Sequence, residues 1–265
     1  MELQALVRLN EEMRKLKIVG IIPARYASTR FPGKPLVDIC GRPMIWWVYR
    51  QLSLVSELSK VYVALDDERV AEVCRQYDIP FLLTRDDHAT HLDRLAEFAE
   101  RVSADFYINI NGDEPLMRPE YVRMLLPPDE VDPEQFYFAN AMTLIKDPVE
   151  VVDTARIKIA TDVDGNALYM ARTPIPYPKA SGTFQYKKFV GIQCASRPAL
   201  LFCGQVPRAE LEGIEDIDEY RLLEHGKKIR FIMTDAETRS VDTPKDLEHV
   251  RKVIGRQIET GEIAL

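Results

Sequence analysis

The chain has few cysteines and no long apolar run. Its four cysteines lie far apart among 265 residues and form no CxxC pair, so neither a disulfide framework nor a zinc site is expected. No segment approaches the roughly 20 apolar residues that a membrane-spanning helix needs, and the N-terminal segment lacks the apolar core of a signal peptide. These absences predict a cytoplasmic protein with reduced thiols and no membrane partner.

Two common nucleotide-binding motifs are also missing. GxGxxG does not follow the first predicted strand, which disfavours a nicotinamide-dependent oxidoreductase, and Pro35 after Lys34 breaks the pattern GxxxxGK[ST] of P-loop ATPases. The net charge of −7 disfavours non-specific binding of nucleic acid, because such binding needs clustered Lys and Arg. A nucleotide can still bind wherever basic groups converge locally.

Strand-like and helix-like patterns alternate over the first half of the chain. The predicted elements are strands at 18–22, 60–65, 80–84 and 105–110, and helices at 44–54, 69–77 and 92–102. This alternation is typical of βαβ units, which build a mainly parallel sheet covered on both faces. We therefore predict an α/β, Rossmann-like fold of three layers.

The pattern becomes richer in strands after Pro127. Strands are predicted at 136–145, 157–161, 167–170, 189–195 and 229–233, and helices at 217–225 and 244–258. Because the strands predicted between 136 and 195 interrupt the alternation of strands and helices, we interpret about 136–200 as a β-rich insert. The predicted organisation is a helical extension at 1–16 followed by a single domain at 17–265.

The loop at 23–34 is the first candidate site. It follows the first predicted strand, and ligands of doubly wound sheets bind at the carboxyl ends of strands. It gathers Arg25, Arg30 and Lys34 with Ser28 and small residues that let backbone N–H groups approach an anion. A solvated basic turn is the alternative, but the density of cations directly after a strand favours binding of a triphosphate.

Two carboxylates form the second candidate site. Asp113 follows the strand at 105–110 in the string NGDEP, and a carboxylate at such a tip suits Mg²⁺ that is held by few protein oxygens and by substrate phosphates. Asp242 precedes the last predicted helix, for which Asp242 or Thr243 is a candidate N-cap. If Asp242 reaches the same ion, the two residues supply the carboxylate pair that a bridging metal needs.

Taken in order, these motifs resemble the CMP-Kdo synthetases, the cytidylyltransferases for 3-deoxy-manno-octulosonate (Kdo). The matching blocks include IIPARYASTRFPGKPLVDICGRPMI, TRDDH, NGDEP, IKIATDVDGNALYMARTPIP and VDTPKDLEHVR, and they extend over nearly the whole chain. The resemblance implies transfer of CMP from CTP by a glycosyltransferase-A-like core. It also implies Mg²⁺ as cofactor, a β-rich dimerisation insert and a homodimer.

The resemblance further implies roles for individual residues. The residues expected to bind the nucleotide are Ala24, Arg25, Ser28, Arg30, Lys34, Arg85 and Gly112. The residues in matching blocks that are expected near the acceptor or phosphates are Arg94, Lys158 and Arg172. The predicted catalytic group is Arg25, Lys34, Asp113 and Asp242, of which the two aspartates would bind the metal.

The chain departs from the family pattern at the acceptor motifs. Residues 88–94 read HATHLDR where the family usually has H-x-S-G-T-[DE]-R, and Asn111 replaces a Gln. The segment 215–219 is also more acidic than expected. We therefore expect His91, Asn111 and Glu215 to contact the acceptor.

Three functions stay open at this point. The first is cytidylyl transfer to a 3-deoxy-2-keto sugar acid such as Kdo. The second is transfer to a small phosphonate, whose oxygen is already anionic and needs only positioning. The third is a non-catalytic nucleotide-binding regulator, which the presence of both aspartates together with Arg25 and Lys34 disfavours because binding alone does not require a metal pair.

Overall fold

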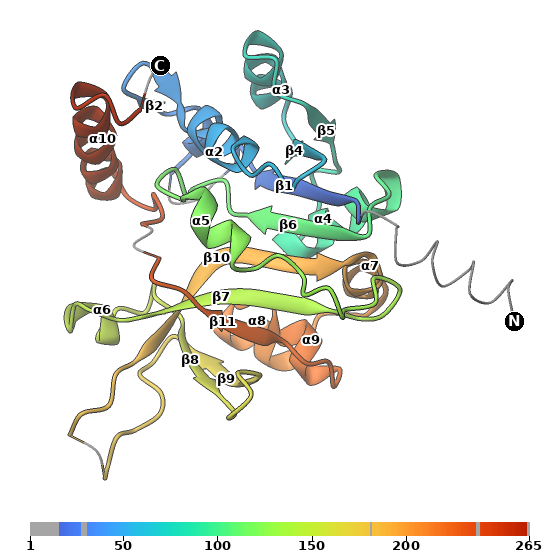
Figure 1. Ribbon diagram of the computed structural model, residues 1–265, viewed down its shortest axis with the longest axis vertical. Coiled ribbons are helices and arrows are strands. Elements are labelled where there is room, and N and C mark those ends of the chain that lie inside the picture. Colours follow the sequence, from blue (N-terminus) through green and yellow to red (C-terminus); the bar gives the residue numbers. More distant parts are fainter. Residues whose placement is uncertain (1–15, 28–30, 181, 237–238, 264–265) are drawn as a thin grey trace, which may run out of the picture.

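A single nine-stranded sheet organises the chain in the computed structural model, which describes residues 16–27, 31–180, 182–236 and 239–263 (Figure 1). The main path through this sheet has the order β11-β7-β10-β6-β1-β4-β5. Its strands are β1 (Ile18–Ala24), β4 (Lys60–Leu65), β5 (Phe81–Leu83), β6 (Phe106–Ile110), β7 (Phe138–Leu144), β10 (Lys187–Ser196) and β11 (Arg230–Met233). Residues 1–15 of the predicted N-terminal extension lie outside the described residues.

The pairing is mainly parallel. β1 runs parallel to β4 and β6, β4 to β5, and β7 to β11, whereas β10 is antiparallel to both β6 and β7. The predicted α/β fold with a mainly parallel sheet is confirmed. The stretch predicted as an insert contributes β7 and β10 to the sheet itself, and its other two strands, β8 (Lys158–Thr161) and β9 (Ala167–Ala171), form a hairpin paired to β10.

Helices cover both faces of the sheet and make three layers. One apolar cluster joins the sheet to α2 (Met44–Ser53), α3 (Glu68–Gln76) and α5 (Pro119–Arg123). A second cluster joins the other face to α4 (His91–Arg101), α7 (Arg197–Gln205), α8 (Glu210–Glu215) and α9 (Tyr220–Glu224). A third cluster packs α10 (Pro244–Glu259) against α2 and the short hairpin of β2 (Asp38–Ile39) and β3 (Arg42–Pro43). The remaining elements are η1 (Lys34–Leu36) and α6 (Val149–Val152).

The central strands have apolar residues on both sides because both faces are covered. Along β1, Ile18 and Ile22 belong to the first cluster, whereas Val19 and Ile21 belong to the second. Successive side chains of a strand point to opposite faces, so this alternation divides one short strand between two cores. Every residue of β6 is buried for the same reason.

Two differences from the sequence prediction affect the site. The helix expected at 217–225 begins only at Tyr220, so Asp218 and Glu219 lie in the turn before it. The helix α7 was not predicted because its nine residues show no clear amphipathic period. No helix among the described residues combines the length and the apolar character needed to cross a membrane.

The tips of β1 and β6 approach each other closely. A Cβ atom added at Gly112 would lie 2.7 Å from the Pro23 carbonyl oxygen, so only glycine fits between the two strand ends. On the other side of this tip, the Val241 N–H donates to the Asp113 carbonyl at 2.9 Å. Two residues later, Thr243 caps α10 in a reciprocal capping box, as the sequence predicted.

We predict that Gly112→Ala destabilises the fold by about 1–3 kcal/mol, because the added methyl group must displace backbone rather than a flexible side chain. Chemical denaturation measures the change. The matched control is Gly213→Ala in α8, where nothing lies within 4 Å of the new Cβ; this change is expected to be neutral or to stabilise by up to about 1 kcal/mol. Equal midpoints for the two variants would contradict the close approach.

Candidate active site

A cavity of about 400 Å³ opens at the carboxyl ends of β1 and β6. Its walls come from the loop after β1, the loop after β6, the start of α4 and the turn before α9. The residues that line it include Ala24, Arg25, Lys34, His91, Arg94, Asn111, Gly112, Asp113 and Asp218. Eight of these nine are residues that the sequence singled out, and Asp218 is the addition.

Lys34 lies between the two predicted metal ligands. Its Nζ is 2.6 Å from Asp113 Oδ2 and 3.5 Å from Asp242 Oδ1. Burial lowers the pKa of Lys34, but the Asp113 and Asp242 carboxylates outweigh this effect and raise it above its ordinary value. The structure thus brings together one ammonium and two carboxylates that are up to 208 residues apart in sequence.

The carboxylate pair fits a divalent cation. Asp113 Oδ1 is buried and has no hydrogen-bond partner among the residues that the structure describes, so it is a candidate acceptor for a ligand. No group of three or more His, Cys, Asp and Glu side chains with metal-binding geometry occurs among the described residues. In nucleotide sites Mg²⁺ is usually bound by one or two carboxylates and by phosphate oxygens of the substrate. Asp113 and Asp242 match this pattern.

Arg25 and Arg85 lie in different surroundings. Arg25 lines the cavity, and its guanidinium donates to the carbonyl oxygen of His88. Arg85 does not line it: its exposed side chain forms a two-pronged pair with Asp87, at 2.7 and 2.8 Å. The geometry therefore keeps Arg25 at the cavity and leaves Arg85 outside it. Ser28 and Arg30, from the same loop as Arg25, lie outside the described residues.

Arg94 links the α4 wall of the cavity to the loop after β1. It is 1% exposed, and it donates to Asp66 Oδ2 at 2.7 Å and to the Thr84 hydroxyl. The other oxygen of Asp66 accepts from the backbone N–H of Tyr26 at 3.3 Å. Arg94 thus has a paired charge, and through Asp66 it positions the loop after β1. Asp66 was not predicted as a site residue, although it directly follows β4 at the same edge of the sheet.

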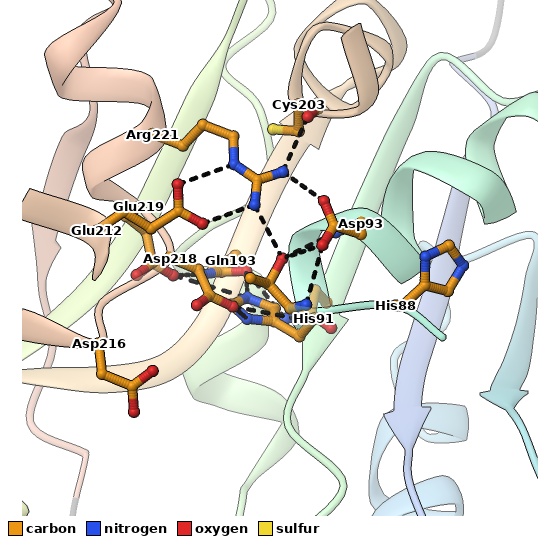
Figure 2. A network of polar contacts seen from close by, with 12 residues as sticks. His88, His91, Asp93, Gln193, Cys203, Glu212, Asp216, Asp218, Glu219 and Arg221 are labelled. Atoms are coloured by element: carbon orange, nitrogen blue, oxygen red, sulfur yellow. Dashed lines mark hydrogen bonds and ion pairs between the residues drawn. The ribbon is translucent and has the colours of Figure 1, made fainter. Parts of the chain in front are cut away.

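His91 is the first residue of α4 and meets the turn before α9 (Figure 2). Its Nδ1 lies 2.5 Å from Asp218 Oδ2, which also accepts from the His91 backbone N–H at 3.1 Å. Burial lowers the pKa of His91, but the adjacent Asp218 carboxylate, helped by Glu219, raises it to about 9. The ring is therefore an imidazolium at neutral pH.

A buried polar network holds this corner in place (Figure 2). Arg221 donates to Glu212 at 2.6 and 3.0 Å, and to Asp93 and Thr90, which form the capping box of α4. Behind His91, Gln193 accepts from Asn109 at 2.9 Å and donates to the buried Glu219. Buried polar groups that are satisfied in this way rigidify their surroundings.

Three of the expected acceptor residues lie away from the cavity. Lys158 is fully buried, and its ammonium donates to three backbone carbonyls, those of Asp153, Arg156 and Arg172. An ammonium has three N–H groups, so Lys158 has none left for a substrate. The contacts of Lys158 are therefore structural.

Arg172 and Glu215 form a contact between β9 and α8. The Arg172 side chain donates to the carbonyls of Glu215, Thr154 and Asp216 at 2.5, 3.1 and 2.7 Å, and the Glu215 carboxylate accepts from the Arg172 N–H at 3.1 Å. Neither residue lines the cavity. The acidic residue that does reach the cavity from this segment is Asp218, three positions further along.

Asn111 and Gly112 lie in the cavity wall at the tip of β6. The Asn111 N–H donates to the Gly191 carbonyl at 3.1 Å, and a Cβ at Gly191 would lie 2.7 Å from Asn111 Nδ2. Gly191 therefore leaves room for the Asn111 side chain. The close approach at Gly112 is to the Pro23 carbonyl of β1, so the glycine joins the two strand tips.

The fold and these residues define a nucleotidyltransferase. Residues 19–229 match the family model described as Cytidylyltransferase, and the chain belongs to this family. It is 38% identical over 92% of its length to the 3-deoxy-manno-octulosonate cytidylyltransferase of Solibacter usitatus, covering 97% of that protein. It is also 38% identical over 91% of its length to the enzyme of that name from Escherichia coli, covering 98% of it.

A solved structure agrees with these sequence matches. The chain resembles CMP:2-keto-3-deoxy-manno-octonic acid synthetase in complex with CTP, with a TM-score of 0.84 and 39% identity, covering 91% of this chain and 99% of the other. The resemblance to the CMP-Kdo synthetases that the sequence motifs indicated is confirmed.

We predict that Lys158→Met destabilises the protein by about 2–4 kcal/mol, because three buried carbonyls lose their donor. The KM values of the folded variant should equal those of the wild type, since Lys158 does not reach the cavity. Thermal or urea unfolding and steady-state kinetics measure the two effects. The control is Lys228→Met at an exposed lysine, and a raised KM in folded Lys158→Met would contradict the structural role.

The raised pKa of His91 predicts a dependence of stability on pH. The unfolded histidine titrates near 6.5 and the folded one at about 9. The stabilisation from its proton is therefore fully present below about pH 6.5 and is lost as the pH rises through 9. The gap in unfolding free energy between wild type and His91→Gln should shrink over this range, by about 3 kcal/mol at most. Parallel curves from pH 6 to 9.5 would contradict the pairing with Asp218.

Proposed function

We propose that the protein transfers CMP from CTP to a 3-deoxy-2-keto sugar acid such as Kdo and releases pyrophosphate. The observation that carries the proposal is the position of Lys34, which lines the cavity together with Asp113 and lies 3.5 Å from Asp242, in a chain that belongs to the cytidylyltransferases. The names of the relatives supply the acceptor class. CTP and a small acidic acceptor are the proposed partners.

The loop after β1 binds the triphosphate in this proposal. Arg25 and Lys34 both line the cavity, and Ser28 and Arg30 belong to the same loop. Lys34 now shares its charge with two carboxylates, and an incoming triphosphate would compete with them for its N–H groups. Cations placed in this way neutralise charge that develops on the leaving pyrophosphate, which is the main demand of phosphoryl transfer.

Asp113 and Asp242 would hold Mg²⁺. When bound, this ion would supply Lewis-acid stabilisation of phosphate oxygens and lower the pKa of a coordinated hydroxyl. Asp113 contributes an oxygen that accepts no hydrogen bond from the described part of the chain. Backbone contact between Val241 and Asp113 fixes the second aspartate next to the first. Arg94 of α4 binds Asp66, and Asp66 binds the backbone of the loop after β1, so this loop is held at a fixed position relative to α4.

The hairpin of β8 and β9 supports a proposed homodimer. It exposes large apolar side chains: Val163 is fully exposed, Leu168 is 64% exposed and Tyr169 is 38% exposed. Apolar side chains gathered on one element favour burial against another chain. We propose that this part of the stretch 136–200 makes the dimer contact.

Release of pyrophosphate from CTP tests the function. With Mg²⁺, wild type should release pyrophosphate only when a 3-deoxy-2-keto sugar acid is present, and EDTA should abolish the release. Asp113→Asn should lower kcat by about 100-fold or more, since it removes a metal ligand worth several kcal/mol in the transition state. CTP binding measured by calorimetry without metal should be preserved.

The control is Asp129→Asn, which changes an exposed carboxylate in the loop before β7 and should leave kcat unchanged. Preference for a small phosphonate over the sugar acids would support the alternative acceptor. Tight CTP binding without any pyrophosphate release, in both wild type and Asp113→Asn, would instead indicate a nucleotide-binding regulator and refute the proposal.

A further inference from the structure

We infer that His91 and Asp218 bind hydroxyl groups of the acceptor and select a long, polyhydroxylated sugar acid. Both side chains line the cavity, and they come from α4 and from the turn before α9. The inference rests on the proposed function and specifies which part of the acceptor this wall of the cavity recognises.

The pair presents one free acceptor and one weakly engaged donor. Both contacts of Asp218 with His91 use Oδ2, and among the described residues no hydrogen bond involves Asp218 Oδ1. His91 Nδ1 is occupied by Asp218, whereas Nε2 reaches Gln193 Oε1 only at 3.4 Å. His91 and Asp218 keep 26% and 15% of their side-chain surface exposed.

A hydroxyl group matches this combination. It donates one hydrogen bond and accepts others, so a single hydroxyl or a vicinal pair can donate to Asp218 and accept from His91. An ionised carboxylate can only accept, and a carboxylate or a phosphonate would meet the Asp218 oxygen as a like charge.

The charges at the start of α4 also disfavour binding of an anionic group of the acceptor there. The imidazolium of His91 is compensated by Asp218, and Glu219 Oε1 lies 3.7 Å from Nε2. Arg94, the other cation of the α4 wall, is compensated by Asp66 at 2.7 Å. This wall therefore offers polar groups without excess positive charge, which suits the uncharged end of a polyol.

The pair is fixed before any ligand arrives (Figure 2). Thr90 precedes His91 and caps α4, and Arg221 holds this cap together with Glu212. Gln193, bound to Asn109 on β6, supports the ring from behind. Groups held in this way lose little conformational entropy when a ligand binds, so each hydrogen bond contributes more of its strength to selectivity.

Two acceptors of different length test the inference. The probes are Kdo, with eight carbons, and 2-keto-3-deoxygluconate, which has six and lacks the two terminal hydroxyl-bearing carbons. We expect His91→Ala and Asp218→Asn each to raise the KM for the eight-carbon acid by about 10-fold, the value of one net hydrogen bond. The KM for the six-carbon acid should change less than 2-fold, and the affinity for CTP should stay at the wild-type value.

His249→Gln is the control, because His249 is exposed on α10 and does not line the cavity. Retained CTP binding shows that each variant is folded, and Asp218→Asn keeps the shape of the side chain if His91→Ala does not fold. An unchanged KM for the eight-carbon acid, or an equal rise for both acids, overturns the inference alone. A wild type that uses neither acid, or prefers a phosphonate, overturns the proposed acceptor as well.

Discussion

The contact between the tips of β1 and β6 is the constraint on which the site depends. Gly112 lies against the Pro23 carbonyl, and this spacing places the loop that carries Lys34 beside the loop that carries Asp113. A side chain between the tips would move both loops apart. The Asp113 carbonyl, in turn, accepts from Val241, so the same tip also fixes the position of the second carboxylate. Three chemical groups from distant segments thus depend on one close approach of backbone.

The ammonium of Lys34 makes this arrangement stable without substrate. Two partly buried carboxylates beside each other repel, and a cation between them removes that repulsion. The same cation can bind phosphate. When a triphosphate binds Lys34, the Asp113 and Asp242 carboxylates are released from the ammonium and become available to other ligands. The site is therefore held together by the charges that its substrate would rearrange.

Much of the fold was predictable because apolar periodicity reports burial directly. The alternation along β1 and the continuous burial of β6 reflect a sheet covered on both faces, and the glycine and aspartate after β6 signalled a strand tip. Contacts across the chain were not predictable. Lys158 stands in a block that suggested a substrate, yet only the folded chain shows three carbonyls around its ammonium. Asp218 was not predicted as a site residue because the sequence placed it inside a helix at 217–225, whereas this helix begins at Tyr220.

The start of α4 places a charged histidine in the wall of the cavity. A histidine in place of a flexible turn brings a bulky cation to the start of the helix, and an isolated cation there would attract any anion. Asp218 pairs with it at 2.5 Å, so its donor remains while its charge is compensated. The capping box of Thr90 and Asp93, tied to Arg221, keeps the histidine at a fixed position on the helix. Such a wall can distinguish ligands by the number and placement of their hydroxyl groups. The loop after β1, which carries Arg25 and Lys34, can bind the anionic groups.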